Sequence, residues 1–225
     1  MKLSNESLTI LKNFATINNG IKFRTGQRQS TMAETKTVLA IANLTEEFPV
    51  DFCIHDLNQF LSVHNSLYKD AGELEFDGNN NVIFRKGRYN TTYRMADESQ
   101  IVVAPEKGIN VDVYDLSFTL VAEDLDWVLK TASVLSLPNI AVRSDGEKVE
   151  IFTFDGKDDS KSNNTIQIGD GNGTKFKVVF KTDYWKMIPG TYQVDVTLKG
   201  FSRFKNSNGA IEYVIAIEKD ISSLG

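Results

Sequence analysis

The sequence has one cysteine, two histidines and no long apolar run among its 225 positions. The single cysteine, Cys53, cannot form a disulfide within the chain, which favours a reducing compartment. No stretch approaches the roughly 18 apolar residues that a membrane-spanning helix requires, so we expect no membrane association. The first residues lack a basic patch followed by an apolar run, and we expect no signal peptide. Together these absences predict a cytoplasmic protein.

The scarcity of histidine and cysteine also argues against a catalytic or metal centre. His64 falls on the apolar side of a predicted helix, and Cys53 falls in an apolar strand-like run. Both positions are more typical of a core than of an active site, and with His55 they are too few for a closed zinc site. The glycine-rich stretch 169–173 precedes a strand rather than a helix and lacks the glutamate that ends a calcium loop. We therefore expect a protein that is not an enzyme and needs no cofactor or metal.

The charge is modestly negative, with 30 acidic and 25 basic residues and a net charge of −5. This balance argues against a basic nucleic-acid-binding protein, whose surface is rich in lysine and arginine. It leaves open a protein whose few cations gather on one surface while the rest is acidic. The placement of the cations decides between these possibilities.

Hydrophobic spacing predicts an α+β protein made of two similar halves. Helical spacing of apolar residues is found at residues 5–18, 56–68, 123–135 and 183–188. Strand patterns are found at 21–24, 37–42, 50–54, 73–76, 82–85, 91–95, 116–122, 140–143, 149–154, 166–168, 176–181, 192–199, 201–205 and 212–218. We interpret the halves as two domains, 1–105 and 106–225, each with two helices on antiparallel strands. An exposed connector at about 97–110 joins them and contains Pro105 and Gly108.

Short stretches in a fixed order resemble the sliding clamps of T-even-type phages, which are processivity factors of the phage DNA polymerase. The most specific is LKNFATIN at residues 11–18, which follows MKLS at the start of the chain. The others are DLN at 56–58 with Phe60 and Leu61, VVAP at 102–105, AEDL at 122–125, PG at 189–190 with Tyr192, and YV at 213–214 with Ala216 and Glu218. They span nearly the whole chain, but the segments 27–36 and 155–164, which we take for loops, match nothing in the family.

The resemblance implies the DNA-clamp fold and a homotrimer that closes into a ring around duplex DNA. Helices of all domains would line the hole, and sheets would form the outer rim. Such a protein would tether the replicative DNA polymerase, would be opened by a clamp loader, and would work in viral DNA replication in the cytoplasm of an infected bacterial host. Docking of transcription partners is a further implication. The alternative is a β-rich phage structural or ligand-binding module, for which we expect a monomer or another symmetry.

Four lysines are the candidate DNA-facing residues, because each falls on the polar side or at the end of a predicted helix. They are Lys12, Lys69, Lys130 and Lys186. Sparse cations among neutral polar residues suit a surface that must hold DNA loosely while it slides. The alternative is that these lysines are only solvated helix faces.

A second candidate surface is a pocket for the peptide tails of partner proteins. The resemblance places it near the connector and the last strand of the second domain. Its candidate residues are Ile101, Val102, Val103, Pro105, Pro189, Tyr213, Ile215 and Ile217. The alternative is that the connector's apolar residues pack inward and fix the connector to its own domain.

Overall fold

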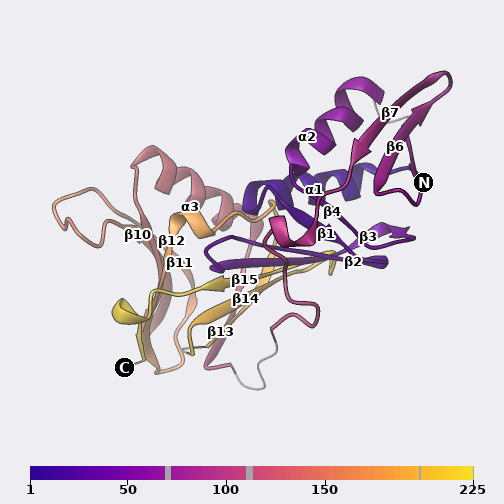
Figure 1. The fold of residues 1–225 in the computed structure, drawn as a ribbon. Coiled ribbons are helices and arrows are strands. Elements are labelled where there is room, and N and C mark those ends of the chain that lie inside the picture. Colours follow the sequence, from indigo (N-terminus) through magenta and orange to yellow (C-terminus); the bar gives the residue numbers. More distant parts are fainter. Residues whose placement is uncertain (69–71, 110–113, 198, 225) are drawn as a thin grey trace. The chain divides into compact units, whose positions relative to one another are not determined.

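The chain forms two compact units, Met1–Ile109 and Asn110–Gly225 (Figure 1). The computed structural model describes residues 1–68, 72–109, 114–197 and 199–224. All strand pairs with a recorded register are antiparallel, and helices pack against the sheets, so the α+β prediction is confirmed. The predicted division after residue 105 falls just inside the first unit.

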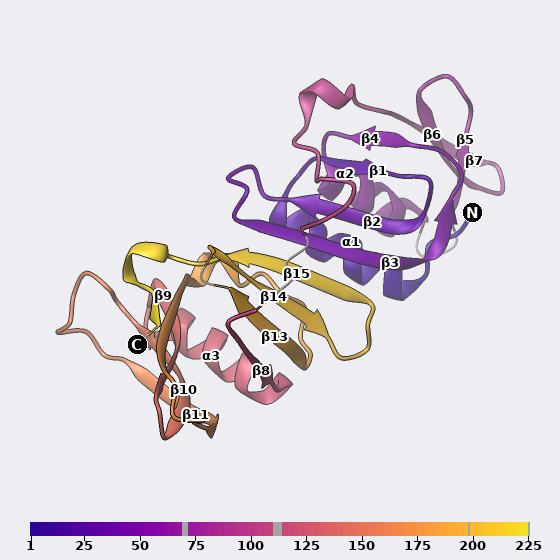
Figure 2. The same cartoon turned by 90° about the horizontal axis from the view of Figure 1, so that it is seen from below.

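The first unit places two helices on one side of its strands, as Figure 2 shows for α1 and α2 behind β1 to β4. Its helices are α1 (Asn5–Ile17), α2 (Leu57–Ser62) and the π-helical η1 (Val63–Tyr68) that continues α2, with a 3-10 turn η2 (Glu98–Gln100). Its strands are β1 (Ile21–Phe23), β2 (Gly26–Met32), β3 (Val38–Phe48), β4 (Phe52–Ile54), β5 (Glu73–Phe76), β6 (Asn81–Lys86) and β7 (Tyr89–Arg94). They pair as β1 with β4, β2 with β3, and β5-β6-β7.

Helix α1 forms where the sequence predicts it, because its start is capped and its apolar residues share one face. The Ser4 hydroxyl accepts a hydrogen bond from the Ser7 amide at 3.2 Å, which satisfies one of the free amides of the first turn. The buried residues are Ser7, Leu8, Ile10, Leu11, Phe14, Ala15 and Ile17. The exposed ones include Asn5, Thr9, Lys12 and Thr16, the polar face that the spacing predicts.

In the part of the second unit that the structure describes, one α-helix forms, α3 (Ala122–Val134), which packs against β10 and β11. Its strands are β8 (Leu116–Leu120), β9 (Asn139–Asp145), β10 (Lys148–Phe154), β11 (Asn164–Asp170), β12 (Lys175–Lys181), β13 (Tyr192–Thr197), β14 (Phe201–Asn206), β15 (Ile211–Ala216) and β16 (Ser223–Leu224). They are ordered β11-β10-β9-β12-β16 in one sheet and β15-β14-β13-β8 in the other. Two 3-10 turns, η3 (Thr182–Tyr184) and η4 (Lys219–Ile221), complete the unit.

The helix predicted at residues 183–188 is wrong. Only the 3-10 turn η3 forms. Beyond it the burial of successive side chains alternates, with Trp185 and Met187 buried and Lys186 exposed. Pro189 disfavours helical backbone in the residue before it, and the alternating burial suits an extended segment. The described residues of the second unit therefore contain one α-helix where two were predicted.

Two smaller expectations also need correction. The loop predicted at 27–36 is wrong in its first part, because residues 26–32 form strand β2, in which Gln29, Ser30 and Thr31 are buried despite their polarity. Leu67, predicted on the apolar side of its helix, is 65% exposed, and the next residue, Tyr68, is buried instead. Residues 63–68 form a π-helix, which has more residues per turn than an α-helix, so α-helical spacing no longer predicts the buried face there.

Candidate functional surfaces

The exposed side chains of α1 include one cation, Lys12, and one acid, Glu6 in the first turn, and the side chains next to Lys12 are neutral. Lys12 is exposed between Thr9 and Thr16, and no acidic side chain of the described residues pairs with it. The hydroxyls of Thr9 and Thr16 donate to main-chain carbonyls of their own helix at 2.8 and 2.7 Å. These hydroxyls are therefore engaged locally, and Lys12 is the group on this face that is available to an anion.

The face of α2 and η1 that points to solvent is uncharged over the described residues. Its exposed polar side chains are Asn58, Gln59, Ser62 and Ser66. Asp56 caps the start of α2 by accepting from the Gln59 amide at 2.8 Å. Lys69, the candidate cation at the end of this helix, lies outside the described residues.

On α3 the candidate cation is already paired. The Lys130 ammonium lies 2.6 Å from the Asp126 carboxylate, one helical turn earlier. Glu123 is exposed in the turn before, so this face has no excess of positive charge. Trp127 and Val134 are 57% and 81% exposed and add an apolar component. The face of α3 therefore differs in chemistry from that of α1.

Lys186 is exposed, but it lies on the extended segment after η3 and not on a helix. Thus α1 and α3 each place one candidate lysine on a helix, and the third described lysine is presented by a loop.

The connector is fixed to the first unit by polar bonds at several points. Lys22 donates to Glu98 at 2.7 Å, and this hydrogen bond raises the pKa of the lysine. The buried Asn18 amide donates to the Val102 carbonyl at 3.2 Å, and Arg24 donates to the Ala104 carbonyl at 2.7 Å. Connector residues 98–104 therefore follow the surface of their own unit.

Close packing at Gly20 reinforces this attachment. A Cβ at Gly20 would lie 2.8 Å from Cγ2 of Ile101, closer than real Cβ atoms approach a neighbour. Ile101, Val102 and Val103 remain partly exposed, while Ala104 is buried. A cavity of about 290 Å³ adjoins Ile101 and Val102; its other lining residues are Asn18, Asn19, Gly20, Glu34, His55, Ser99 and Gln100. The connector is thus both fixed and partly accessible.

The predicted pocket residues of the second unit need a partial correction. Tyr213 and Ile215 have no exposed surface, and Ile217 is buried, because alternate residues of β15 and its extension face the core. Pro189 is exposed. Buried side chains cannot contact a docked peptide directly, so of these four residues only the exposed Pro189 is accessible to a partner.

Tyr213 instead holds the loop that presents Pro189. The Ile188 amide donates to the Tyr213 hydroxyl at 3.1 Å, and the Tyr192 hydroxyl donates to the Ile188 carbonyl at 2.7 Å. Burial raises the pKa of both phenols, so they remain protonated over any ordinary pH range. The two tyrosines therefore position the loop rather than line a pocket.

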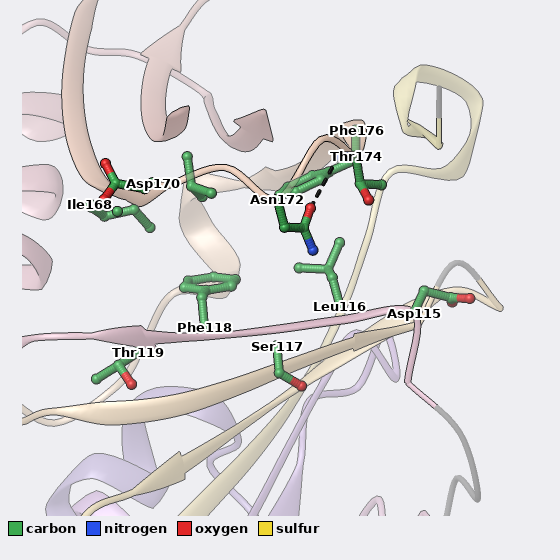
Figure 3. A pocket seen from close by; sticks show the side chains of 12 residues that line it. Asp115, Leu116, Ser117, Phe118, Thr119, Ile168, Asp170, Asn172, Thr174 and Phe176 are labelled. Carbon is green, nitrogen blue, oxygen red and sulfur yellow. Dashed lines mark hydrogen bonds between the residues drawn. The ribbon is translucent and has the colours of Figure 1, made fainter. Parts of the chain in front are cut away.

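A groove of about 300 Å³ opens in the second unit between β8 and the turn that follows β11 (Figure 3). Leu116 and Phe118 rise from β8 toward Asn172, whose side chain accepts a hydrogen bond from the Thr174 amide at 3.1 Å. The strand register shifts between β10 and β11, so Ile168 has no partner on β10. Residues distant in sequence form this groove, and no local pattern predicts it.

Within the described part of the chain, no three His, Cys, Asp or Glu side chains converge in a way that could hold a metal ion. Cys53 is buried, and that burial raises the pKa of its thiol. No helix of the described residues is long and apolar enough to span a bilayer.

Comparison with known proteins places both units in one family. A family model described as a DNA polymerase processivity factor matches residues 4–104, and one described as the C-terminal part of the gp45 sliding clamp matches residues 117–219. The sliding clamp of Vibrio phage KVP40 is 33% identical over 97% of this chain and 99% of its own. The sliding clamp of Enterobacteria phage T4 is 33% identical over 98% of each chain. The chain belongs to the sliding clamp family.

Solved structures support the clamp fold at lower sequence identity. PCNA from Thermococcus kodakaraensis matches with a TM-score of 0.66 and 18% identity, over 95% of this sliding clamp and 96% of that chain. The β clamp of Helicobacter pylori matches with a TM-score of 0.69 and 13% identity, over 93% of this chain and 63% of that one. The resemblance drawn from LKNFATIN and the other ordered stretches is therefore confirmed.

Proposed function

We propose that this sliding clamp assembles as a homotrimeric ring around duplex DNA and tethers the replicative DNA polymerase during processive synthesis. The observation that carries the proposal is the outer face of α1, where Lys12 has no acidic partner among the described residues and lies between the neutral side chains of Thr9 and Thr16. A ring that slides needs weak attraction to phosphate and few directional contacts, since strong or base-reading contacts oppose movement. Family membership supports the same role.

Two strand edges support the assembly of a ring. β7 is an edge strand of the first unit and β11 of the second, and neither has a recorded neighbour on its outer side among the described residues. Unpaired strand edges are templates for pairing with another chain. A contact between two different edges is head-to-tail, and such contacts close into rings when the rotation between copies allows it. We assign β7 and β11 to the junctions between three subunits.

Partner proteins dock, in this proposal, on the accessible connector residues and the Pro189 loop. The candidates that remain exposed or partly exposed are Ile101, Val102, Val103, Pro105 and Pro189. Two related folds are named as complexes with partner segments: the H. pylori β clamp with a DNA ligase peptide and Archaeoglobus fulgidus PCNA with the C-terminal region of FEN-1. The polymerase and the clamp loader are the partners proposed here, with transcription proteins as further users of the surface.

The proposed role needs no catalytic centre and no cofactor, since the ring acts by topology and the loader supplies the energy of opening. The cytoplasm of an infected bacterium is the proposed site of action, because the relatives named above are phage proteins.

The decisive experiment combines mass and topology. Light scattering should give three times the chain mass, and clamp loaded on nicked circular DNA should be retained until the circle is linearised. A monomer, or equal loss from circular and linear DNA, would contradict the proposal.

A further inference from the structure

The turn between β6 and β7 concentrates positive charge in a protein that is acidic overall. Residues 85–89 read Arg-Lys-Gly-Arg-Tyr, and no acidic residue occurs between Arg85 and Arg94. All five residues of this stretch are exposed, and Tyr89 is 60% exposed. We call residues 85–89 the hairpin tip.

The cations of the hairpin tip are not equally engaged. Arg85 pairs with Glu75 on β5 at 3.0 Å, and the Lys86 ammonium donates to the Tyr68 carbonyl at 3.1 Å. Arg88 has no acidic partner among the described residues; its guanidinium lies over the Tyr89 ring at 5.3 Å and donates to the phenol oxygen at 3.2 Å. Arg88 therefore offers an uncompensated positive charge that is held against an exposed aromatic ring.

The tip is anchored beside the end of the α2–η1 helix, as Figure 1 shows. Besides the bond from Lys86, the Tyr68 hydroxyl lies 2.8 Å from the Thr91 hydroxyl. A lysine at the carbonyl end of a helix is also favoured by the helix dipole. The tip therefore lies at the end of η1, beside a helix whose outer face has no charge of its own over the described residues.

We propose that the hairpin tip is a second DNA-contacting element, which binds phosphates of the encircled duplex through Arg88 with Tyr89 packed alongside. The inference rests on the proposed function, because it takes the faces of α1 and α2 as the surface around DNA. It goes beyond the lysines of the helices: the tip supplies at the end of α2 the charge that the helix face lacks. A planar guanidinium suits bidentate contact with a phosphate, and an adjacent aromatic ring restricts its motion.

Duplex DNA is the occupant that the charges favour. Three cations within five residues match a polyanion, and the stretch 85–89 contains no aliphatic side chain that an amphipathic peptide could pack against. A competing occupant is a second copy of the chain, because β7 is also an edge strand with no recorded outer neighbour among the described residues. Strand pairing would use the backbone along β7, whereas the side chains at the tip stay available for DNA. The test below separates the two occupants.

The experiment places a photocrosslinking amino acid at position 89, 12 or 157 of the full-length clamp, one at a time, and loads each on nicked circular DNA. We expect crosslinks to DNA at 89 and 12 and none at 157, which lies in an exposed loop of the second unit. Crosslinking at 12 without crosslinking at 89 would overturn the hairpin inference alone. Absence at both positions would overturn the proposed DNA-lining role as well, and a crosslink from 89 to another clamp chain would assign the tip to the subunit junction.

A matched pair of charge variants measures the contribution of Arg88. Arg88→Gln and Lys157→Gln each remove one exposed cation, so their net charges are equal. We expect Arg88→Gln to shorten retention on circular DNA about two- to fivefold at moderate salt and to weaken its salt dependence. Equal retention of the two variants, with both still trimeric, would refute the contact.

Discussion

The ammonium of Lys130 lies 2.6 Å from the carboxylate of Asp126, one turn earlier on α3. This pair makes α3 different from α1, whose Lys12 has no acidic partner among the described residues. Exposed i,i+4 pairs contribute little to helix stability. The main consequence of this pair is that the Asp126 carboxylate offsets the positive charge of Lys130. Lys12 and Lys130, each on the first helix of its unit, therefore differ in the net charge that they offer to an anion.

Removing the acidic partner should expose the masked charge. Asp126→Asn leaves Lys130 without its counter-charge, so we expect retention of the loaded clamp on circular DNA to lengthen about two- to fivefold at low salt. The readout is the half-life on DNA at several salt concentrations. Asp220→Asn, an exposed position on η4, makes the same change in net charge and should leave the half-life unaltered. Equal effects of the two variants would mean that only net charge matters.

Charge reversal should be more damaging on α1 than on α3. Lys12→Glu places a negative charge on a neutral polar face, and we expect loading and retention to fall about tenfold or more, because one attraction is replaced by one repulsion in every subunit. Lys130→Glu acts on a face that already carries Glu123 and Asp126, and its effect should be smaller. Processive synthesis with the polymerase and loader measures both. A larger loss for Lys130→Glu would contradict this ranking.

The sequence predicts the two-unit architecture because it depends on periodicities that packing preserves. The face of α1 emerges as predicted, since Leu8, Leu11 and Phe14 all return to one side at 3.6 residues per turn. Strand β2 is missed because its buried Gln29 is polar, and its burial is compensated by bonds that no pattern reveals. The Gln29 side chain accepts from the Arg24 amide at 2.8 Å and donates to the Arg24 carbonyl at 2.7 Å.

The functional surfaces were less predictable than the fold. The i,i+4 spacing of Asp126 and Lys130 was visible in the sequence and indicates a pair, whereas the attachment of the connector through Asn18 depends on a long-range contact. The family resemblance predicts Tyr213 in a partner pocket, but the alternation of its strand places the side chain in the core. Sequence patterns predict which face of a helix or strand is buried. The residues that pack against that face are known only from the tertiary structure.

The acid side of the stability curve should depend on Asp51. The Thr25 amide donates to its carboxylate at 2.8 Å and the Thr25 hydroxyl at 2.9 Å, and these hydrogen bonds lower the pKa of Asp51. A pKa that is lower in the folded state contributes stability above the unfolded value of about 4, and this contribution is lost as the pH falls through the folded pKa. Asp51→Asn should therefore lower the unfolding temperature at pH 7. The difference in unfolding temperature between the variant and the parent clamp should become smaller below about pH 4.

The control for Asp51 is Asp220→Asn, which changes a carboxylate without these hydrogen bonds to Thr25. Its unfolding temperature should follow that of the parent protein from pH 7 to pH 3. If the unfolding temperatures of Asp51→Asn and the parent differed by a constant amount over this pH range, the Asp51 carboxylate would make no pH-dependent contribution to stability through its bonds to Thr25.

A methyl group at Gly20 should displace the connector. The added Cβ would meet Cγ2 of Ile101 at 2.8 Å, and relief of such a contact typically costs about 1–3 kcal/mol. We expect Gly20→Ala to lower the free energy of unfolding by this amount and to increase amide hydrogen exchange around Val102, whose carbonyl accepts from Asn18. Gly169→Ala is the control, because a Cβ there meets no atom within 4 Å. Equal destabilisation of the two variants would remove the steric explanation.

A charge on the connector should separate partner binding from ring assembly. Val103 is partly exposed, and its neighbours are fixed to the first unit by Asn18 and Arg24. Val103→Asp places a carboxylate where an apolar side chain of the polymerase tail would lie, and burying that charge should weaken binding at least tenfold. Val50→Asp makes the same chemical change at another exposed position of the unit and should leave affinity unchanged. Calorimetric titration with the tail peptide measures the docking surface, and light scattering measures whether the trimer is still assembled. If Val103→Asp bound the peptide with the affinity of the parent clamp, the connector would not be part of the docking surface.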